Sequence, residues 1–288
     1  MREDMPPPRK HHYLPEWYLS RWKRPWNGKE VIWEFGRVGP KKKLHSRYRH
    51  PSATGYAIDL YTIPNRDPED ASEIETKLLQ FVDDRGAKAI AMAERNELAG
   101  PEDKVGLVRF MLSMLHRSPE RIEFLENRLR EDLFENPLFA DEDPSVFRAG
   151  ALNVFVDLVQ SQAMIERMME LSVFIINLND NAYDLMTSDS PLMMSNGLAH
   201  RDAFVILPTG PRTLVMLAEN KSLPQHVAGY SGKIVSKAMN DAVIVQAKKL
   251  VFGADRRQER FIDNRLNRPV AQSAKSIDPV TGLVKWKI

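Results

Sequence analysis

Apolar side chains recur every three or four positions through the middle of the chain and again near its C-terminal end. That spacing gathers them on one face of an α-helix, which packs against the rest of the protein. The run 103–116 is apolar almost all round, so we expect its helix to be buried. Gly-Pro, Ser-Pro and Asp-Pro pairs separate the runs. The pattern predicts helices over 70–98, 103–116, 119–134, 143–171, 232–248 and 255–265.

Both ends of the chain carry shorter apolar or alternating runs, which are typical of β-strands. The expected strands are 30–35, 56–63, 172–177, 183–187, 203–207, 213–218 and 250–252. Strands at both ends with helices grouped between them predict an α+β fold. In this fold a mixed or antiparallel sheet is built from N- and C-terminal strands, and residues of about 70–171 form a central helical insertion.

We expect one α+β domain over residues 11–265, preceded by a disordered Pro-rich tail over 1–10 and followed by a C-terminal extension over 266–288. Two separate domains are less favoured, because neither set of strands is sufficient for a sheet alone. Of the 288 residues, 43% are hydrophobic and 28% are charged, which fits a folded chain rather than a disordered one.

The chain has no cysteine, which excludes disulfides, thiolate metal sites and a cysteine nucleophile. No apolar run approaches the roughly 18–20 residues of a membrane span, and the N-terminus lacks the apolar core of a signal peptide. We therefore expect a cytoplasmic protein with no membrane partner. The sequence also lacks a Gly-rich phosphate loop, a Gly-x-Ser-x-Gly elbow, a His-Glu-x-x-His helix and a Rossmann fingerprint.

The formal charge of +2 hides an asymmetry, because residues 1–50 carry 13 Lys and Arg against 5 Asp and Glu. The same segment holds four of the five tryptophans. Cations pair with phosphates and aromatic rings stack on bases, so this composition predicts contact with a nucleic-acid strand. The alternative is that the tryptophans are core residues and the lysines keep the loops around them soluble. The candidate nucleic-acid contacts are Trp22, Arg24, Trp26, Lys41, Lys42, Lys43, Arg47 and Arg49.

Two adjacent histidines, His11 and His12, precede an aromatic segment restricted by Pro15. An imidazole can act as a general base near neutral pH and can contact a metal or a phosphate. The alternative is a hydrogen-bonded pair that fixes the N-terminal segment to the body of the protein.

Glu75 lies at the edge of the apolar face of the first long helix. A carboxylate at such a border can coordinate a metal or have a raised pKa. It can equally cap the helix or pair with an arginine.

Arg109, Ser113 and His116 fall on one line of an otherwise apolar helix, because steps of four and seven residues return to nearly the same angle. Arg117 follows them. Buried polar groups need partners, which here are an internal carboxylate or an anionic ligand. A structural salt bridge between Arg117 and the acidic helices explains the pattern as well.

Asp189 follows an alternating strand, in the turn Thr187-Ser-Asp-Ser-Pro191. Turns of this kind often carry base or metal-binding carboxylates, although the pattern is also common in purely structural turns.

Taken in order, these motifs resemble an uncharacterised domain family found in bacteria, phages and some fungi. Its members open with His-His-Tyr-Val-Pro and continue with a Glu-bearing helix, an Arg-Thr-Pro element, a Ser-Asp-x-Pro turn and an Asn-bearing C-terminal helix. In this chain Leu14 replaces the usual valine and Ser118 the usual threonine. The resemblance covers about residues 10–253 and implies that the matched polar residues converge in one pocket, without implying a reaction. The matching positions are His11, His12, Tyr13, Pro15, Tyr18, Leu19, Glu75, Arg117, Pro119, Ser188, Asp189, Pro191, Pro208 and Asn240.

These residue types lead to the hypothesis of a metal-assisted phosphodiester hydrolase that acts on nucleic acid. In this hypothesis Glu75, Asp189 and His12 hold a divalent cation, Mg²⁺ or Mn²⁺, and His11 or His12 deprotonates the attacking water. Arg117 then stabilises the phosphoryl charge and Asn240 positions it.

Two other interpretations of the same residues stay open. The first is a non-enzymatic module that binds nucleic acid or protein, with the His, Asp and Arg side chains as a buried structural network. The second is an enzyme for a small anionic substrate, held by Arg109 and Arg117.

Overall fold

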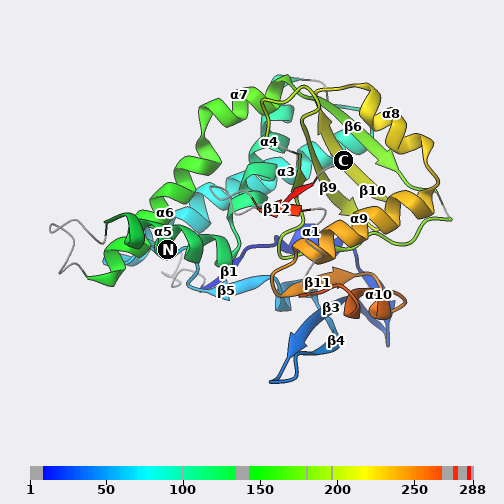
Figure 1. Ribbon diagram of the computed structural model, residues 1–288. Helices are drawn as coiled ribbons and strands as arrows, with labels where there is room; N and C mark the ends of the chain where they lie inside the picture. Colours follow the sequence, from blue (N-terminus) through cyan, green and yellow to red (C-terminus); the bar gives the residue numbers. More distant parts are fainter. Residues whose placement is uncertain are drawn as a thin grey trace.

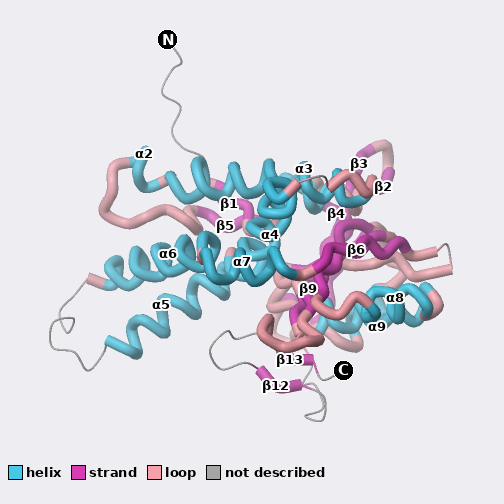
Figure 2. Tube along the Cα trace, turned by 90° about the horizontal axis from the view of Figure 1, so that it is seen from above, coloured by secondary structure: helices cyan, strands magenta, loops and turns pink. Residues whose placement is uncertain are grey.

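The computed structural model describes residues 9–98, 100–133, 143–179, 181–195, 197–267, 275–277 and 284–286. It confirms the expected α+β class, with antiparallel sheets built from both ends of the chain around a helical middle. Figure 1 shows the chain, and Figure 2 shows α2, α5, α6 and α7 with the β1–β5 pair toward one side and the two larger sheets with α8 and α9 toward the other. Among the described helices none is both long and apolar enough to cross a membrane.

The N-terminal segment forms a small sheet of β1 (Lys10–His12) paired antiparallel with β5 (Tyr56–Ile58). Arg9 pairs with Asp59 at 2.6 Å. The last two residues of the predicted tail, Arg9 and Lys10, are therefore part of the fold, whereas residues 1–8 lie outside those described. The strand expected over 56–63 ends at Ile58, because Asp59 adopts a φ of +53° and turns the chain.

The sheet that joins the two ends of the chain has the order β2-β3-β11-β7, with β4 also paired to β3. It consists of β2 (Arg24–Trp26), β3 (Lys29–Val38), β4 (Lys43–Arg49), β7 (Thr187–Ser188) and β11 (Leu250–Gly253). The central pairing sets Val251 opposite Phe35, and both are fully buried. Helix α10 (Glu259–Asp263) packs here through Ile262, beside Leu266. Leu266 opens the predicted C-terminal extension and is itself part of the core.

The second sheet has the order β6-β10-β9-β8 and is antiparallel throughout. Its strands are β6 (Ser172–Asn177), β8 (Met193–Met194), β9 (Phe204–Gly210) and β10 (Thr213–Ala218). The expected hairpin of 203–207 and 213–218 is thereby confirmed. Helices α8 (Ser222–Gly229) and α9 (Gly232–Gln246) follow it. The short strands β12 (Lys275–Ile277) and β13 (Val284–Trp286) pair with each other, and the rest of 268–288 lies outside the described residues.

The single helix expected over 70–98 is three consecutive pieces: α2 (Pro68–Ala71), the π-helical segment η2 (Ile74–Leu79) and α3 (Gln80–Glu94). Helix α4 (Pro101–His116) packs closely on α3, since a Cβ on Gly86 would come within 2.5 Å of the Phe110 ring. Helix α5 (Pro119–Leu133) follows. The helix expected over 143–171 breaks at Ser161, which accepts a hydrogen bond from the Met164 amide and separates α6 (Pro144–Gln160) from α7 (Gln162–Glu170).

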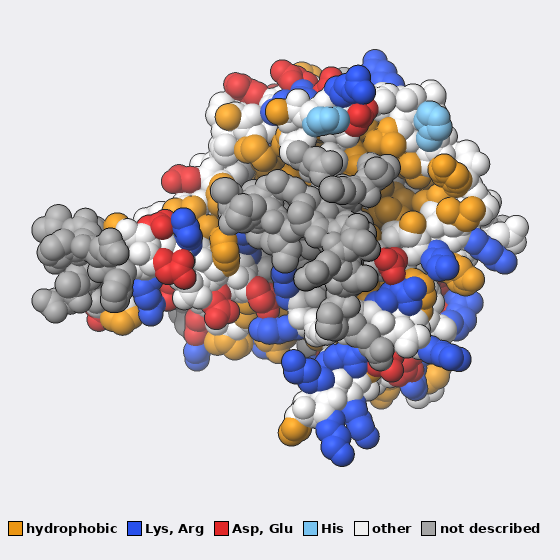
Figure 3. Space-filling model, viewed as in Figure 1, with side chains coloured by type: hydrophobic (Ala, Val, Ile, Leu, Met, Phe, Trp, Pro, Cys, Tyr) orange, Lys and Arg blue, Asp and Glu red, His pale blue; other side chains and the backbone are white. Residues whose placement is uncertain are grey.

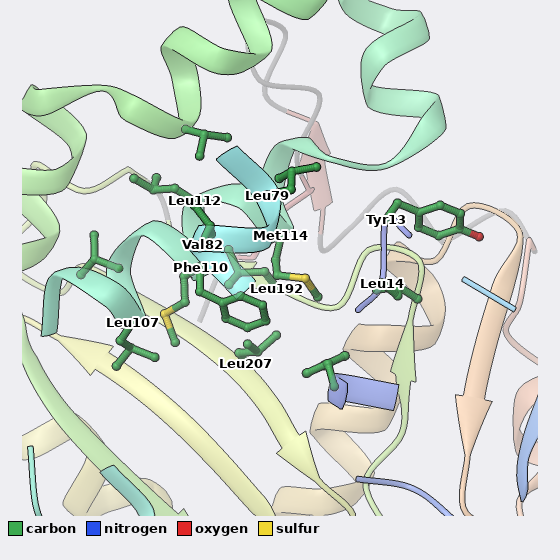
Figure 4. Packing of buried hydrophobic residues seen from close by; sticks show 14 of the residues in the cluster. Tyr13, Leu14, Leu79, Val82, Leu107, Phe110, Leu112, Met114, Leu192 and Leu207 are labelled. Carbon is green, nitrogen blue, oxygen red and sulfur yellow. The ribbon is translucent and has the colours of Figure 1, made fainter. Parts of the chain in front are cut away.

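The main core lies between these helices and the second sheet. Figure 4 shows Phe110 of α4 packed against Leu207 of β9, with Val82 of α3 beside them. The short helix α1 (Glu16–Ser20) and the 3₁₀ turn η1 (Pro51–Ala53) close the end near β1. Tyr18 of α1 donates a hydrogen bond of 2.7 Å to the Pro208 carbonyl. Two of the family-motif positions therefore meet in the fold as structural partners.

Candidate functional site

Arg117, which follows the last residue of α4, is fully buried and carries the central charge of a polar cluster. Its guanidinium donates to both carboxylate oxygens of Asp83, at 2.6 and 3.0 Å, and to the His12 carbonyl at 2.8 Å. Burial opposes the charge, yet the Asp83 carboxylate outweighs it and the pKa of Arg117 is raised. The two Nη atoms of the guanidinium are therefore bonded inside the protein and join β1 to α3 and α4, while its Nε is buried without a partner.

Glu75 lies on η2, next to this pair. A π-helical segment widens the helix and often occurs where a side chain has a functional position. Burial raises the pKa of Glu75 to about 7, although the Arg117 charge and a hydrogen bond from the His12 backbone both oppose the rise. Its Oε2 is buried without any hydrogen-bond partner. Glu75 thus exchanges a proton near neutral pH and has one oxygen free to do so.

The His12 ring lies on the same side of β1 as Tyr56, whose ring is 5.5 Å away in an edge-on arrangement. Its Nε2 is also buried and without a partner, and burial lowers its pKa, so the imidazole is neutral at physiological pH. A neutral imidazole with an unused nitrogen can accept a proton. We call His12, Glu75, Asp83 and Arg117 the His12–Glu75 site.

His11 faces the other way and is built into the core. Its Nδ1 accepts the Tyr61 amide at 2.9 Å, and its ring stacks on the Tyr61 ring at 5.7 Å. The Tyr61 hydroxyl in turn donates to the Arg117 carbonyl at 2.5 Å. The structural interpretation of the histidine pair therefore describes His11, while His12 has the open nitrogen.

Asp189 and Asn240, the other two predicted catalytic residues, bond to a different part of the fold. Asp189 accepts three backbone amides, from Lys248, Lys249 and Leu250, at 2.8, 2.6 and 2.8 Å. Burial raises the pKa of Asp189 to about 6 against the pull of these three amides. Its carboxylate fastens β7 to the turn that leads into β11.

Asn240 is fully buried on α9, where its oxygen accepts the Met186 amide at 2.8 Å. Its nitrogen donates to the Asp184 carbonyl at 2.9 Å and to the Gln258 side chain at 3.0 Å. Every polar atom of this side chain is thus occupied by the segments next to β7 and α10. These interactions place Asn240 in a structural network with Asp184, Met186 and Gln258.

The expected metal ligands Glu75, Asp189 and His12 do not form a ligand group. Within the described ranges no set of three or more His, Asp or Glu side chains is arranged to hold a metal ion. Both Asp189 oxygens already accept backbone amides. The divalent-cation site therefore stays a prediction, and we derive no chemical step through a metal.

A second feature is a groove of about 770 Å³ between the β3–β4 hairpin and the segment that includes α10. Two acidic residues also line it, Glu259 and Asp263. In Figure 3 cationic side chains cluster on the projecting hairpin at the bottom of the molecule. We call this feature the basic groove. Its cationic lining residues are Arg37, Lys41, Lys42, Lys43, Arg256, Arg257 and Arg260.

The arginines of the C-terminal wall were not candidates in the sequence. They reach the groove because β11, which precedes them, pairs with β3. Arg37 pairs with Asp263 at 3.0 Å and Arg256 with Glu259 at 2.7 Å. Among the described residues Arg260 and the three lysines form no ion pair, so their charge is available to an external anion.

Of the two tryptophans predicted to contact nucleic acid, Trp22 lies in the core and Trp26 at the surface. Trp22 is fully buried and its Nε1 donates to the Leu185 carbonyl at 2.7 Å, so its indole cannot stack on a base. Trp26 is 46% exposed and packs 5.5 Å from Trp33, which lies 6.1 Å from the half-exposed Tyr48. The rings of Trp26 on β2 and Tyr48 on β4 are therefore accessible at the surface, on the two strands that pair with β3.

The remaining predicted cations lie along the same strands. Arg24 is exposed on β2, and Arg47 of β4 contacts the buried Glu34 at 2.5 Å. Arg49 ends β4, and its Nε is buried without a partner. Three residues on, at Ser52, the backbone hydrogen-bonds to His12. Strand β4 thus runs from the basic groove toward the His12–Glu75 site.

Comparison with known proteins places this α+β chain in an uncharacterised family. A family model described as "Protein of unknown function (DUF4238)" matches residues 10–257. The chain belongs to that family. No curated protein and no solved structure matches it significantly.

Proposed function

We propose that the protein binds a nucleic-acid strand along the basic groove, with bases stacked on Trp26 and Tyr48. The observation that carries this proposal is the groove itself, where two segments far apart in sequence bring seven cationic side chains together. Phosphates pair with such cations regardless of sequence, and each stacked base adds about 1–3 kcal/mol. We expect this activity in the cytoplasm.

Binding of a fluorescent single-stranded DNA or RNA oligonucleotide tests this proposal through its anisotropy. Replacing Lys41, Lys42 and Lys43 with alanine is expected to weaken binding by at least about tenfold. A matched triple variant of three exposed lysines near α8 and α9, Lys221→Ala, Lys233→Ala and Lys237→Ala, is expected to bind like the wild type. Equal losses in the two triple variants would contradict a defined groove.

A second candidate function, phosphodiester hydrolysis, is favoured by the unpartnered Oε2 of Glu75 and Nε2 of His12. In this proposal water attacks phosphorus and gives its proton to neutral His12, and the P–O bond to the leaving oxygen breaks. Protonated Glu75 supplies the proton that the leaving oxygen takes. Arg117 acts as a positioning residue, because its guanidinium is buried on Asp83 and His12.

Cleavage of labelled DNA and RNA with Mg²⁺, with Mn²⁺ and with EDTA tests the hydrolase proposal and the expected cation together. We expect cleavage by the wild type and its loss in both His12→Ala and Glu75→Gln, while binding to the basic groove is retained. Cleavage that survives in both variants would contradict the mechanism. Binding by the wild type without turnover would support the non-enzymatic module.

A further inference from the structure

Two hollows in the helical layer meet at the same three residues, Phe81, Val82 and Arg109. One has a volume of about 440 Å³ and lies between η2, α3, α4 and α6. The other has a volume of about 380 Å³ and lies between α3 and the first half of α4. Both fall in the size range of small-molecule sites; the walls of the smaller hollow are mainly apolar, and those of the larger are evenly polar and apolar. The apolar lining residues are Ile74, Leu78, Phe81, Val82, Pro101, Val105, Val156 and Val159.

Arg109 is the polar group where the two hollows meet, and no described carboxylate pairs with it. Among the described residues it has no hydrogen bond and no ion pair, and its Nε is buried without a partner. Its neighbour on the same polar line, Ser113, bonds to the Phe110 carbonyl at 2.8 Å and so does not serve it. Arg109 is half-buried, and a buried guanidinium nitrogen without a partner is costly, so a carboxylate or a phosphate that accepts from it is favoured.

The charges around the junction favour an anion. Two carboxylates also line the hollows: Glu73, which lies 3.9 Å from the Lys77 ammonium, and Glu102 in the first turn of α4. The guanidinium of Arg85 lies 5.4 Å from the centre of the Phe81 ring and adds a second cation to the smaller hollow. Phe81 itself is 48% exposed and offers apolar surface where the two hollows meet.

We propose that these joined hollows bind a small amphipathic carboxylate, with its carboxylate on Arg109 and its unbranched apolar body along Phe81 and the valines. The planar guanidinium matches a carboxylate in a bidentate geometry, and the apolar walls match an alkyl chain. None of these residues belongs to the basic groove or the His12–Glu75 site. The proposal is therefore independent of the nucleic-acid proposal.

Titration with decanoate by calorimetry tests the site, with decanol and decylamine as uncharged and cationic ligands of the same length. We expect decanoate to bind the wild-type protein and the two controls to bind at least about tenfold more weakly, as for the loss of one charge-assisted hydrogen bond. Equal binding of decanoate and decanol would overturn the proposal, because it would show an apolar surface without anion recognition. No binding of decanoate would overturn it as well.

The variant Arg109→Gln is expected to reduce decanoate binding by at least about tenfold. Arg95→Gln, at an exposed arginine that pairs with Glu97, is expected to bind as the wild type does. Because Arg109 has no internal partner, we also expect Arg109→Gln to melt at or above the wild-type temperature. Unchanged decanoate binding in a folded Arg109→Gln would overturn the proposal. The triple lysine variant of the basic groove is expected to bind decanoate normally, which separates the two sites.

Discussion

The guanidinium of Arg117 and the carboxylate of Asp83 form a bidentate ion pair inside the protein. The Arg117 side chain is 2% exposed and the Asp83 side chain 17%. The pair connects α4 to α3, and the same guanidinium reaches the His12 carbonyl of β1. It therefore fixes the distance between the strand that carries His12 and the helix that carries Glu75.

Removing one partner of this pair leaves the other charge buried without compensation. The resulting loss in the free energy of unfolding is expected to exceed the net contribution of the intact pair. We expect Asp83→Asn to lower the free energy of unfolding by about 3 kcal/mol. Its neighbour Asp84 is exposed, so Asp84→Asn is the matched control and is expected to change stability by less than about 0.5 kcal/mol. Urea unfolding of the two variants measures the difference, and similar losses would contradict a buried role for Asp83.

Glu75 is expected to make stability depend on pH. Its pKa is raised to about 7 in the folded protein, above its ordinary value, so the folded state holds the proton more tightly than the unfolded state. The cost of burying the carboxylate is absent at pH 4–5 and grows as the pH rises to about 7. Glu75→Gln is therefore expected to match the wild type at pH 5 and to exceed its stability by about 2 kcal/mol at pH 8.

Glu73→Gln, at an exposed position two residues earlier, is the control for this effect and is expected to show no such divergence. Thermal melts of both variants from pH 5 to pH 8 give the comparison. A constant difference between Glu75→Gln and the wild type across that range would show that Glu75 is ionised throughout.

Asp189 is expected to act on stability through the three amides that it accepts. Asp189→Ala leaves those donors without a partner in the interior, and we expect a loss of about 3 kcal/mol in unfolding free energy. Asp157→Ala, at an exposed site on α6, is the control and is expected to be nearly neutral. A stable Asp189→Ala protein that loses only catalysis would instead favour the original catalytic role.

Trp22 and Trp26 are expected to separate stability from binding. Trp22→Phe removes the hydrogen bond to the Leu185 carbonyl and leaves a gap in the core, so we expect a loss of about 2 kcal/mol in stability. Trp26→Ala is expected to leave the melting temperature within a few degrees and to weaken single-stranded DNA binding by about tenfold. Melting and anisotropy measurements give the comparison. A Trp26→Ala protein that loses several degrees of melting temperature but binds DNA normally would contradict the surface role of Trp26.

Periodicity predicted most helices and strands of this fold, and its failures have physical causes. The apolar pattern does not predict β4, because the alternation of this strand is carried by charged and small polar residues such as Lys43, Arg47 and Ser46. It also does not distinguish the π-helical segment η2 from ordinary helix, since one extra residue in a turn hardly disturbs a 3.6-residue pattern.

The candidate site was predicted in part. His12, Glu75 and Arg117 do meet, as polar residues at the edges of apolar segments often do. The sequence does not single out Asp83, the partner of Arg117, because it lies next to Asp84 and Arg85 on α3 and has the pattern of a solvated face. The cations of the C-terminal wall, such as Arg256 and Arg260, depend on the pairing of β3 with β11, which no local pattern contains.

The salt dependence of binding to a single-stranded oligonucleotide tests the central claim most directly. Affinity measured between low and moderate salt gives a slope of log K against log salt concentration that counts the phosphates released from counterions. We predict that replacing Lys41, Lys42 and Lys43 with alanine lowers that slope by about 2, whereas the lysine control near α8 and α9 leaves it unchanged. A slope that is the same in all three proteins would contradict nucleic-acid binding in the basic groove.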